Sequence, residues 1–174
     1  AMDEVWYPLR VTYHREMRMK AEFEGLGYEC FVPMVYETIM EGERRMKRLV
    51  PSIHNLIFVH ITPGEIAQVR AKHPDWPIRY FMDRETNTPI IVPDAQMRNF
   101  FRVAGRYDEN IVYLDVDTSC LHTGTKVRVM GGAFEGAEGY IKRVKGDRRV
   151  VVEIRGVVAV ATTFVHPSLI EVVG

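Results

Sequence analysis

The sequence predicts an α+β protein in which an antiparallel sheet flanked by helices precedes a small β-barrel. Three observations predict this class. Over residues 4–105, short β-branched and aromatic runs alternate with segments of helical apolar spacing. Residues 122–174 contain five short β-rich runs separated by glycine turns, without a helical period. Residues 106–121 have one basic and four acidic residues and no sustained pattern, so we expect a linker there.

The first strand is expected over residues 5–12, which are rich in aromatic and β-branched side chains. A helix should follow over residues 14–26, because Met19 and Phe23 share one face with polar residues opposite. Gly27 stands where a helix end favours a residue that can take a positive φ. This pattern predicts an amphipathic helix that covers a sheet.

A second strand over residues 28–33 is expected to lead into a β-hairpin arm. The arm rises over residues 35–40, turns at Glu41-Gly42-Glu43 and returns through basic residues. Residues 53–61 are apolar at both alternating sets of positions, as in a strand that is covered on both faces. This strand is therefore the best candidate for the middle of the sheet.

The second helix begins with a capping box, with Thr62 at the N-cap and Glu65 three residues later. Short strands are expected over residues 78–82 and 89–92. Asp94 is then expected to cap a third helix that ends before Gly105, which completes the first domain.

Composition excludes several classes of protein. The 174 residues include 47% hydrophobic and 26% charged side chains, as in ordinary folded proteins. The 23 basic residues balance the 23 acidic ones, which argues against binding along bare nucleic acid. Cys30 and Cys120 have no metal-ligand spacing, so neither a zinc site nor a disulfide framework is indicated. No apolar run approaches the ~20 residues that cross a bilayer. We expect a cytoplasmic monomer with no cofactor and no membrane contact.

The most informative segment is residues 124–145, where glycines surround one aromatic residue between two strands. Glycines supply turn dihedrals that other residues avoid, and the aromatic ring can plug a barrel. A phosphate-binding loop is not indicated, because no GK[ST] follows and no helix opens after the loop. The pattern resembles the KOW motif, at Val129, Gly132, Phe134, Gly136, Gly139 and Ile141.

The first domain extends this resemblance to the NusG-like transcription factors. Trp6-Tyr7 opens the first strand, and YECFVPMV, a basic hairpin, RLVPSIHNLIFVHI and PIIVPDAQM follow in the same order. The resemblance covers residues 4–173. Details are more similar to the operon-specific members, of the RfaH and capsular polysaccharide antiterminator (UpxY-like) type, than to the general factor.

The resemblance implies a fold and a function. Residues 4–105 would form a NusG N-terminal (NGN) domain and residues 122–174 an SH3-like KOW barrel, joined by a linker over 106–121. Such factors are not enzymes; they bind the clamp helices of RNA polymerase and suppress pausing or termination. Strand alternation puts Leu56 and Phe58 on one face and Ile57 on the other. The positions that match the polymerase-binding patch are Leu49, Pro51, Leu56 and Phe58.

The resemblance also implies contacts with upstream or non-template DNA. A solvated, charged surface is the alternative at each of these positions. The positions are His14, Arg15, Arg18 and Lys20 on the first helix, and Arg44 and Arg45 on the hairpin. The KOW barrel would recruit a further partner, with Rho or a small-subunit ribosomal protein as the options.

Two other classes of function compete with this interpretation. An enzyme is disfavoured because the six histidines are scattered and no catalytic motif stands out. A KOW-containing, ribosome-associated RNA-binding protein would normally be strongly basic, whereas this chain is neutral.

Overall fold

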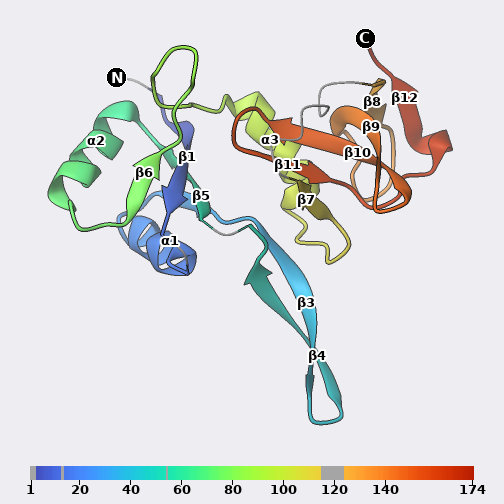
Figure 1. Ribbon diagram of the computed structural model, residues 1–174, viewed down its shortest axis with the longest axis horizontal. Coiled ribbons are helices and arrows are strands. Elements are labelled where there is room, and N and C mark those ends of the chain that lie inside the picture. Colours follow the sequence, from blue (N-terminus) through green and yellow to red (C-terminus); the bar gives the residue numbers. More distant parts are fainter. Residues whose placement is uncertain (1–2, 13, 54, 115–123) are drawn as a thin grey trace. The chain divides into compact units, whose positions relative to one another are not determined.

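The computed structural model describes residues 3–12, 14–53, 55–114 and 124–174 (Figure 1). Two compact units share the chain: Ala1–Pro33 with Ile53–Asp94, and Met34–Ser52 with Ala95–Gly174. The α+β class is confirmed, with an antiparallel sheet and three helices in the N-terminal part followed by a sheet-rich part. Within the described residues, every helix is too short or too polar to cross a membrane.

The sheet of the first unit has four antiparallel strands in the order β2-β5-β1-β6. The strands are β1 (Val5–Val11), β2 (Glu29–Phe31), β5 (Leu56–Ile61) and β6 (Ile78–Tyr80). Helices α1 (Glu16–Gly25) and α2 (Pro63–Lys72) complete this unit. Strand β5 pairs on both sides, so the prediction of a central strand is confirmed.

The two faces of this sheet differ. Leu9 of β1 pairs directly with Ile57 and with Tyr80, so these three side chains share one face. Arg70 of α2 lies over the Tyr80 ring, which places α2 on that face. The opposite face has Pro8 paired with Phe58. Alternation along β5 therefore follows the prediction.

The start of α2 and the end of α1 are both determined by residues close to them in the chain. The Thr62 hydroxyl oxygen accepts a hydrogen bond from the Glu65 N–H at 3.2 Å, which confirms the capping box that begins α2. Gly27 follows α1 with φ 91°, a conformation that favours glycine.

One expected strand does not form. Residues 89–92 make only two isolated bridges, Trp6 with Val92 and Met82 with Pro89. Pro89 and Pro93 flank the segment, and proline has no N–H to donate to a strand ladder. The prediction of a strand here is therefore wrong.

The hairpin arm belongs to the second unit. Strands β3 (Met34–Glu41) and β4 (Arg44–Pro51) pair along their whole length, which confirms the predicted hairpin. At its base the Tyr36 N–H donates to the Tyr107 carbonyl at 2.9 Å. Lys47 lies 3.6 Å from the Glu109 carboxylate.

The second sheet has six strands in the order β12-β8-β9-β10-β11-β7. Its strands are β7 (Val112–Leu114), β8 (Lys126–Val129), β9 (Glu138–Val144), β10 (Asp147–Ile154), β11 (Val158–Ala161) and β12 (Ile170–Val172), with a 3-10 turn at Pro167–Leu169. The five predicted strands are all present. The sixth, β7, lies in the segment expected to be a linker.

Strand β7 forms because its apolar side chains have a partner that local sequence does not reveal. Val112 and Leu114 pack against the buried cluster of Val151, Ala159 and Ala161. The acidic composition of residues 106–121 predicts a linker, and residues 115–121 of that range lie outside the described part of the chain.

Helix α3 (Asp94–Ala104) presents a polar face to strand β9 of the same unit. The Asn99 Nδ2 donates to the Glu138 carbonyl at 2.8 Å, and the Glu138 N–H donates to Asn99 Oδ1, also at 2.8 Å. Arg102 adds a hydrogen bond of 3.3 Å to the Gly136 carbonyl. The helix is thus tied to the backbone of the second sheet.

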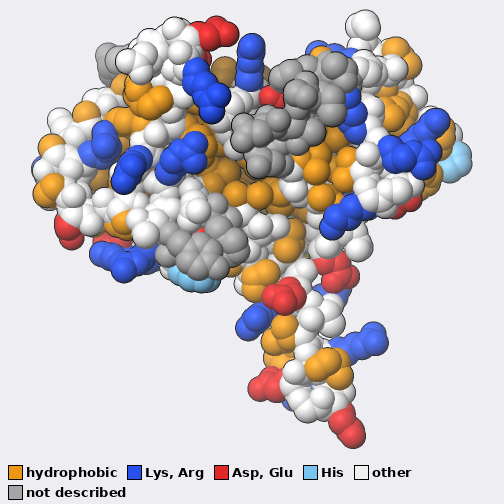
Figure 2. All heavy atoms as spheres, viewed as in Figure 1, with side chains coloured by type: hydrophobic (Ala, Val, Ile, Leu, Met, Phe, Trp, Pro, Cys, Tyr) orange, Lys and Arg blue, Asp and Glu red, His pale blue; other side chains and the backbone are white. Residues whose placement is uncertain are grey.

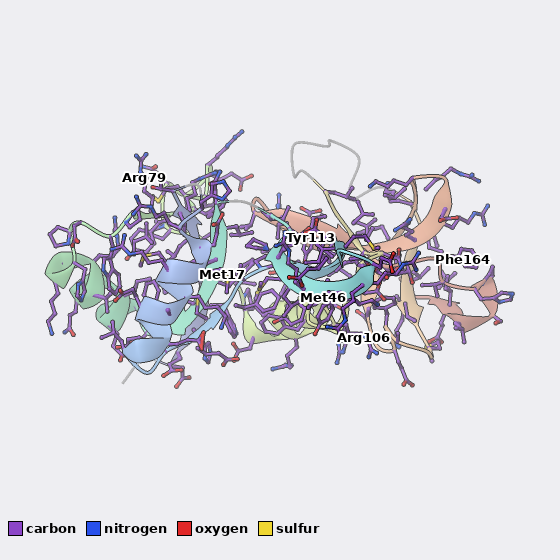
Figure 3. All side chains as sticks on the ribbon, turned by 90° about the horizontal axis from the view of Figure 1, so that it is seen from below. Met17, Met46, Arg79, Arg106, Tyr113 and Phe164 are labelled. Carbon is purple, nitrogen blue, oxygen red and sulfur yellow. The ribbon has the colours of Figure 1, made fainter. Side chains whose placement is uncertain are left out.

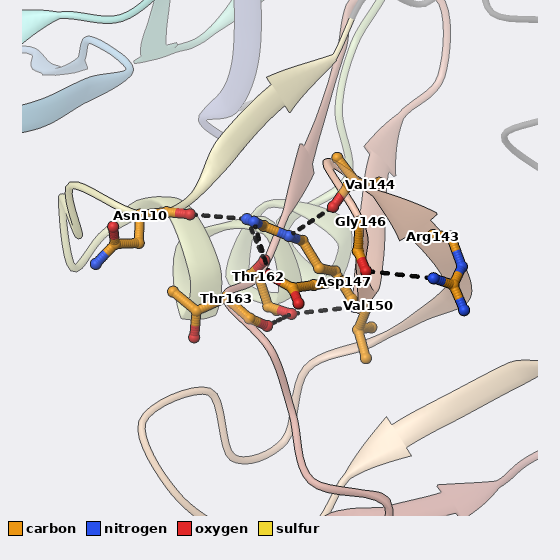
Figure 4. A network of polar contacts seen from close by, with 9 residues as sticks. Asn110, Arg143, Val144, Gly146, Asp147, Val150, Thr162 and Thr163 are labelled. Carbon is orange, nitrogen blue, oxygen red and sulfur yellow. Dashed lines mark hydrogen bonds and ion pairs between the residues drawn. The ribbon is translucent and has the colours of Figure 1, made fainter.

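A buried arginine fastens the strands around β10 (Figure 4). Arg149 is only 9% exposed, and its guanidinium donates to the carbonyls of Val144, Asn110 and Thr162 at 3.1, 2.8 and 3.3 Å. Asp147 lies 3.6 Å away and offsets its charge. Because a buried cation needs such partners, Arg149 has a structural role.

Candidate interaction surfaces

The four positions expected to bind polymerase differ in accessibility. Leu49 is 39% exposed and Pro51 is half-buried, both on β4 of the second unit. Leu56 and Phe58 share one face of β5 in the first unit, but they are only 2% and 0% exposed. Phe58 packs near Phe31, with ring centroids 6.4 Å apart. Both faces of β5 are therefore covered, as the continuous apolar run over residues 53–61 predicts.

The arm carries most of the accessible apolar side chains near these positions. Tyr36 and Leu49 are directly paired across the strands and both are exposed, and Met40 lies two pairs further along the same face. Met46 is exposed on the opposite face (Figure 3). The arm in Figure 2 shows these hydrophobic groups interspersed with charges of both signs.

The basic positions on α1 and the arm are on the surface. His14, Arg15 and Arg18 are exposed, whereas Lys20 is half-buried and paired with Glu24. Arg44 and Arg45 are exposed at the tip of the arm. Five of the six side chains expected to meet DNA are thus exposed.

A second basic region was missed by the sequence interpretation. Arg10 and Arg79 are paired across β1 and β6, and the Arg10 guanidinium carbon lies 4.1 Å from the Phe81 ring centre. Arg70 lies similarly over Tyr80, at 4.3 Å. Figure 2 shows Lys and Arg side chains gathered over this unit, and Figure 3 labels Arg79. In the sequence, the feature that could have indicated this region is an arginine within each of two otherwise apolar strands, Arg10 in β1 and Arg79 in β6.

The six positions compared with the KOW motif lie on β8, on β9 and in the turn between them. Phe134 and Val129 are buried, and Gly132 and Gly136 have φ of 82° and 88°. At Gly139 a Cβ atom would stand 2.1 Å from the Val151 carbonyl oxygen, so only glycine fits. Ile141 is half-buried on β9.

A comparison with protein families gives one match. The family model described as "Transcription termination factor nusG" matches residues 4–101, more than half of the chain. The chain belongs to the NusG family. It is therefore a transcription elongation or termination factor, and factors of this family bind RNA polymerase. A search of curated proteins found no match.

The NusG-family match ends inside α3, so it does not extend to the second sheet. The second sheet is therefore characterised by its own geometry alone. NusG-family proteins are transcription factors and are not known as enzymes.

One histidine of this NusG-family chain lies between two carboxylates. His60 Nδ1 is 3.1 Å from Glu4 and Nε2 is 3.6 Å from Asp94. The ring stacks on Trp6 with centroids 4.7 Å apart. These contacts connect the N-terminal segment, β5 and the start of α3. We therefore assign His60 a structural role.

The environments of Cys30 and Glu65 shift their pKa values in opposite directions. Burial raises the pKa of the Cys30 thiol to about 12, so it stays protonated and unreactive at neutral pH. Hydrogen bonds from Tyr28 and Thr62 lower the pKa of Glu65. Cys120 lies outside the described residues.

Proposed function

We propose that this NusG-family chain is an operon-specific elongation and antitermination factor, of the RfaH or capsular polysaccharide antiterminator type. Its N-terminal domain, residues 4–105, binds the clamp helices of RNA polymerase and suppresses pausing or termination. The family match over residues 4–101 supports this proposal more than any other observation. The protein acts in the cytoplasm as a monomer.

Leu49 is the direct apolar anchor in this proposal. It is exposed beside Tyr36 on one face of the arm, and apolar or aromatic anchors carry most of the energy in helix docking. Pro51 extends the same strand. Leu56 and Phe58 are buried, so their part in polymerase binding is to hold β5 in position. They contact polymerase directly only if the side chains that cover them move away.

Cations on α1 and on the arm contact DNA. Arg15 at the N-cap of α1, Arg18 on α1, and Arg44 and Arg45 at the arm tip are exposed and have the charge to bind phosphates of upstream or non-template DNA. His14 and Lys20 lie on the same segment as Arg15.

The second sheet is a KOW barrel, residues 122–174, with β7 as an added edge strand. The buried Phe134 and the constrained glycines at 136 and 139 support this assignment. The barrel recruits Rho or a small-subunit ribosomal protein. Phe164, which is exposed on the segment after β11, is the side chain best placed to meet it (Figure 3).

The second candidate is a ribosome-associated RNA-binding protein. The glycine-rich geometry of the second sheet favours it, because KOW barrels also occur in ribosomal proteins. The equal numbers of basic and acidic residues weigh against it, since binding to rRNA requires neutralising many phosphates.

The test is a pull-down of RNA polymerase with the full chain. Leu49→Asp is expected to reduce recovery about tenfold or more, because it puts a charge into an apolar contact. Met46→Asp makes the same change on the opposite face of the arm and should keep wild-type recovery. Leu56→Asp and Phe58→Asp are unsuitable, since a buried carboxylate would unfold the sheet.

Two results would reject the proposal. One is a wild-type chain that fails to recover polymerase while binding rRNA tightly, which would establish the ribosomal candidate. The other is equal loss of recovery in both arm variants with circular dichroism unchanged, which would remove Leu49 as the anchor.

A further inference from the structure

An apolar pocket of about 210 Å³ opens beside β12, the last strand of the second sheet. Its apolar side chains come from β9, from the segment after β11 and from β12: Ile141, Phe164, Val165, Pro167, Ile170 and Val172. Phe164 and Val172 are exposed, so the pocket continues into an apolar surface. The volume is below the ~300 Å³ at which sites for whole small ligands begin. It therefore suits an apolar side chain of a partner protein.

The outer edge of β12 is open to a further strand. Within the described residues β8 alone pairs with β12, which stands last in the sheet order. The Val173 N–H donates to the Lys126 carbonyl at 3.0 Å, so Val172 belongs to a pair without hydrogen bonds between its own two residues. The N–H and carbonyl groups of Val172 therefore point away from β8. Such an edge is a template for an added strand.

Two arginines at one end of the pocket face each other without a counter-charge. Arg148 lines the pocket and pairs directly with Arg143 of β9, so both side chains lie on the same face of the sheet. Both are exposed, and among the described residues neither has a carboxylate partner. Arg143 donates to the Gly146 carbonyl at 3.3 Å (Figure 4). Like charges that face each other destabilise a sheet, and an acidic ligand would relieve this repulsion.

The carboxylates close to this pocket in the sequence are engaged elsewhere. Asp147 lies 3.6 Å from the buried Arg149. Glu171 points to the opposite face of β12 from Val172, and its carboxylate lies 3.7 Å from Arg128. The pocket thus has an apolar floor and a cationic end.

We propose that an extended peptide of a partner protein adds to the edge of β12, with an apolar side chain in the pocket and an acidic side chain against Arg143 and Arg148. Strand addition gains affinity from main-chain hydrogen bonds and specificity from pockets for alternate side chains. Because residues two positions apart share one face of a strand, the apolar and acidic residues of the peptide are two positions apart. This strand donor is a further partner, so the proposal goes beyond the proposed function and its options of Rho or a ribosomal protein.

RNA is the competing occupant, because the two arginines would attract phosphates equally well. A nucleic acid cannot extend the hydrogen-bond ladder of β12. Among the described residues that line the pocket, Phe164 is the one aromatic side chain, so a base would find little to stack on. The open edge, the apolar floor and the cationic end together favour a peptide.

The test measures the binding of a labelled heptapeptide, Thr-Glu-Thr-Leu-Thr-Glu-Thr, to the full chain by fluorescence anisotropy. Its leucine and both glutamates lie on one face of a strand, whichever way the peptide runs. The chain is expected to bind it about tenfold or more tightly than the peptide with lysine at both glutamate positions. Replacing the leucine by threonine should weaken binding about tenfold, because the pocket loses its apolar occupant.

Charge at the end of the pocket is tested by a matched pair of variants. Arg148→Glu should weaken binding about tenfold or more, because it reverses the charge that meets the acidic side chain. Its fold is expected to hold, since a glutamate opposite Arg143 replaces a like-charge pair by an ion pair. Arg155→Glu makes the same change in the exposed turn between β10 and β11 and should alter binding by less than about twofold.

Strand addition is tested at Val172. Val172→Pro removes the N–H that points outward and leaves the hydrogen bonds to β8 in place. It should weaken binding about tenfold, whereas Val172→Thr keeps the N–H and the β-branched shape and should change binding by less than about threefold. Circular dichroism of all variants checks that the second sheet is intact.

Several results would overturn the proposal. They are equal binding of the glutamate and lysine peptides, equal losses for Arg148→Glu and Arg155→Glu, and wild-type binding by a folded Val172→Pro. Absence of heptapeptide binding at about 1 mM would overturn it as well. If a labelled oligouridylate bound instead, and Arg148→Glu abolished that binding, the occupant would be RNA.

The polymerase pull-down keeps this proposal apart from the proposed function. Arg148→Glu is expected to recover polymerase normally, because Arg148 lies in the second sheet, outside residues 4–105. If polymerase is recovered and the heptapeptide does not bind, strand addition fails alone. If the heptapeptide binds and polymerase is not recovered, the proposed function fails and the β12 site remains.

Discussion

Asn99 and Glu138 exchange two hydrogen bonds of 2.8 Å, so the side-chain amide of α3 pairs with the backbone of β9 as a neighbouring strand would. A carboxamide has the same donor and acceptor as a peptide group, which allows this substitution. The β9 backbone groups at Glu138 are thereby satisfied away from water. Arg102 continues the contact at Gly136, where an added Cβ would stand 3.1 Å from its Nε.

Asn99→Ala should lower the free energy of unfolding by about 1–3 kcal/mol, because it leaves the Glu138 N–H and carbonyl without partners. Urea denaturation of the full chain, followed by circular dichroism, measures the change. Arg98→Ala, at the exposed neighbouring position, should stay within about 0.5 kcal/mol of the wild type. Equal stability of the two variants would contradict the role of the reciprocal pair.

Gly139→Ala should destabilise the second sheet by about 3 kcal/mol, because its Cβ would overlap the Val151 carbonyl oxygen. Backbone atoms of the adjacent strand cannot move without breaking the β9–β10 ladder. Gly131→Ala is the matched change, since its Cβ meets only the flexible Leu169 side chain at 3.3 Å. Thermal unfolding should show a large loss for Gly139→Ala alone, and a similar small effect at both glycines would refute this packing.

Thr62→Ala should cost about 1 kcal/mol by removing the hydroxyl that caps α2. Chemical denaturation measures it directly. Thr125→Ala, at an exposed threonine of the second unit, is the control and should be near neutral. If Thr62→Ala left the free energy of unfolding unchanged, water would have replaced the Thr62 hydroxyl as the partner of the Glu65 N–H.

Cys30 predicts a loss of stability at alkaline pH. Its pKa is raised from 9.0 to about 12 in the folded chain, so the unfolded chain loses this proton first. The contribution of Cys30 to stability is complete below about pH 9 and declines as pH rises from there toward 12. Urea midpoints across this range, compared between Cys120→Ser and Cys120→Ser with Cys30→Ala, should fall more steeply where Cys30 is present, since the tyrosines whose pKa burial raises titrate in both variants.

The same burial predicts slow reaction of Cys30 with a thiol reagent. In the Cys120→Ser background, native protein should react much more slowly than urea-unfolded protein at pH 8. Rapid labelling of the native chain would show that Cys30 is accessible.

Much of the first unit could be predicted because its signals are local. The capping box at Thr62 and the helix end at Gly27 depend on neighbouring residues only, and both are as expected. The alternation of side chains along β5 correctly predicted that Leu56 and Ile57 lie on opposite faces of the sheet. The apolar run over residues 53–61 also predicted that both sets would be covered, but it could not tell whether the core or a partner covers them, because apolar side chains look alike in both cases.

The candidate surfaces were predicted only in part for the same reason. Arg15, Arg18 and Leu49, which the resemblance singled out, are exposed, as contact with a partner requires. The pocket beside β12 depends on Ile141 and Phe164. These side chains come from a strand and a loop that are far apart in the chain, so no single motif contains them.

By itself the sequence determined the order of the three helices and of most strands, the family resemblance and the glycines of the second sheet, since each depends on residues close together in the chain. Tertiary structure alone decided that Val112–Leu114 becomes a strand, that Arg149 is buried, and that the polar face of α3 meets β9. Each of these outcomes requires a partner distant in sequence, and the free energy of burial depends on that partner.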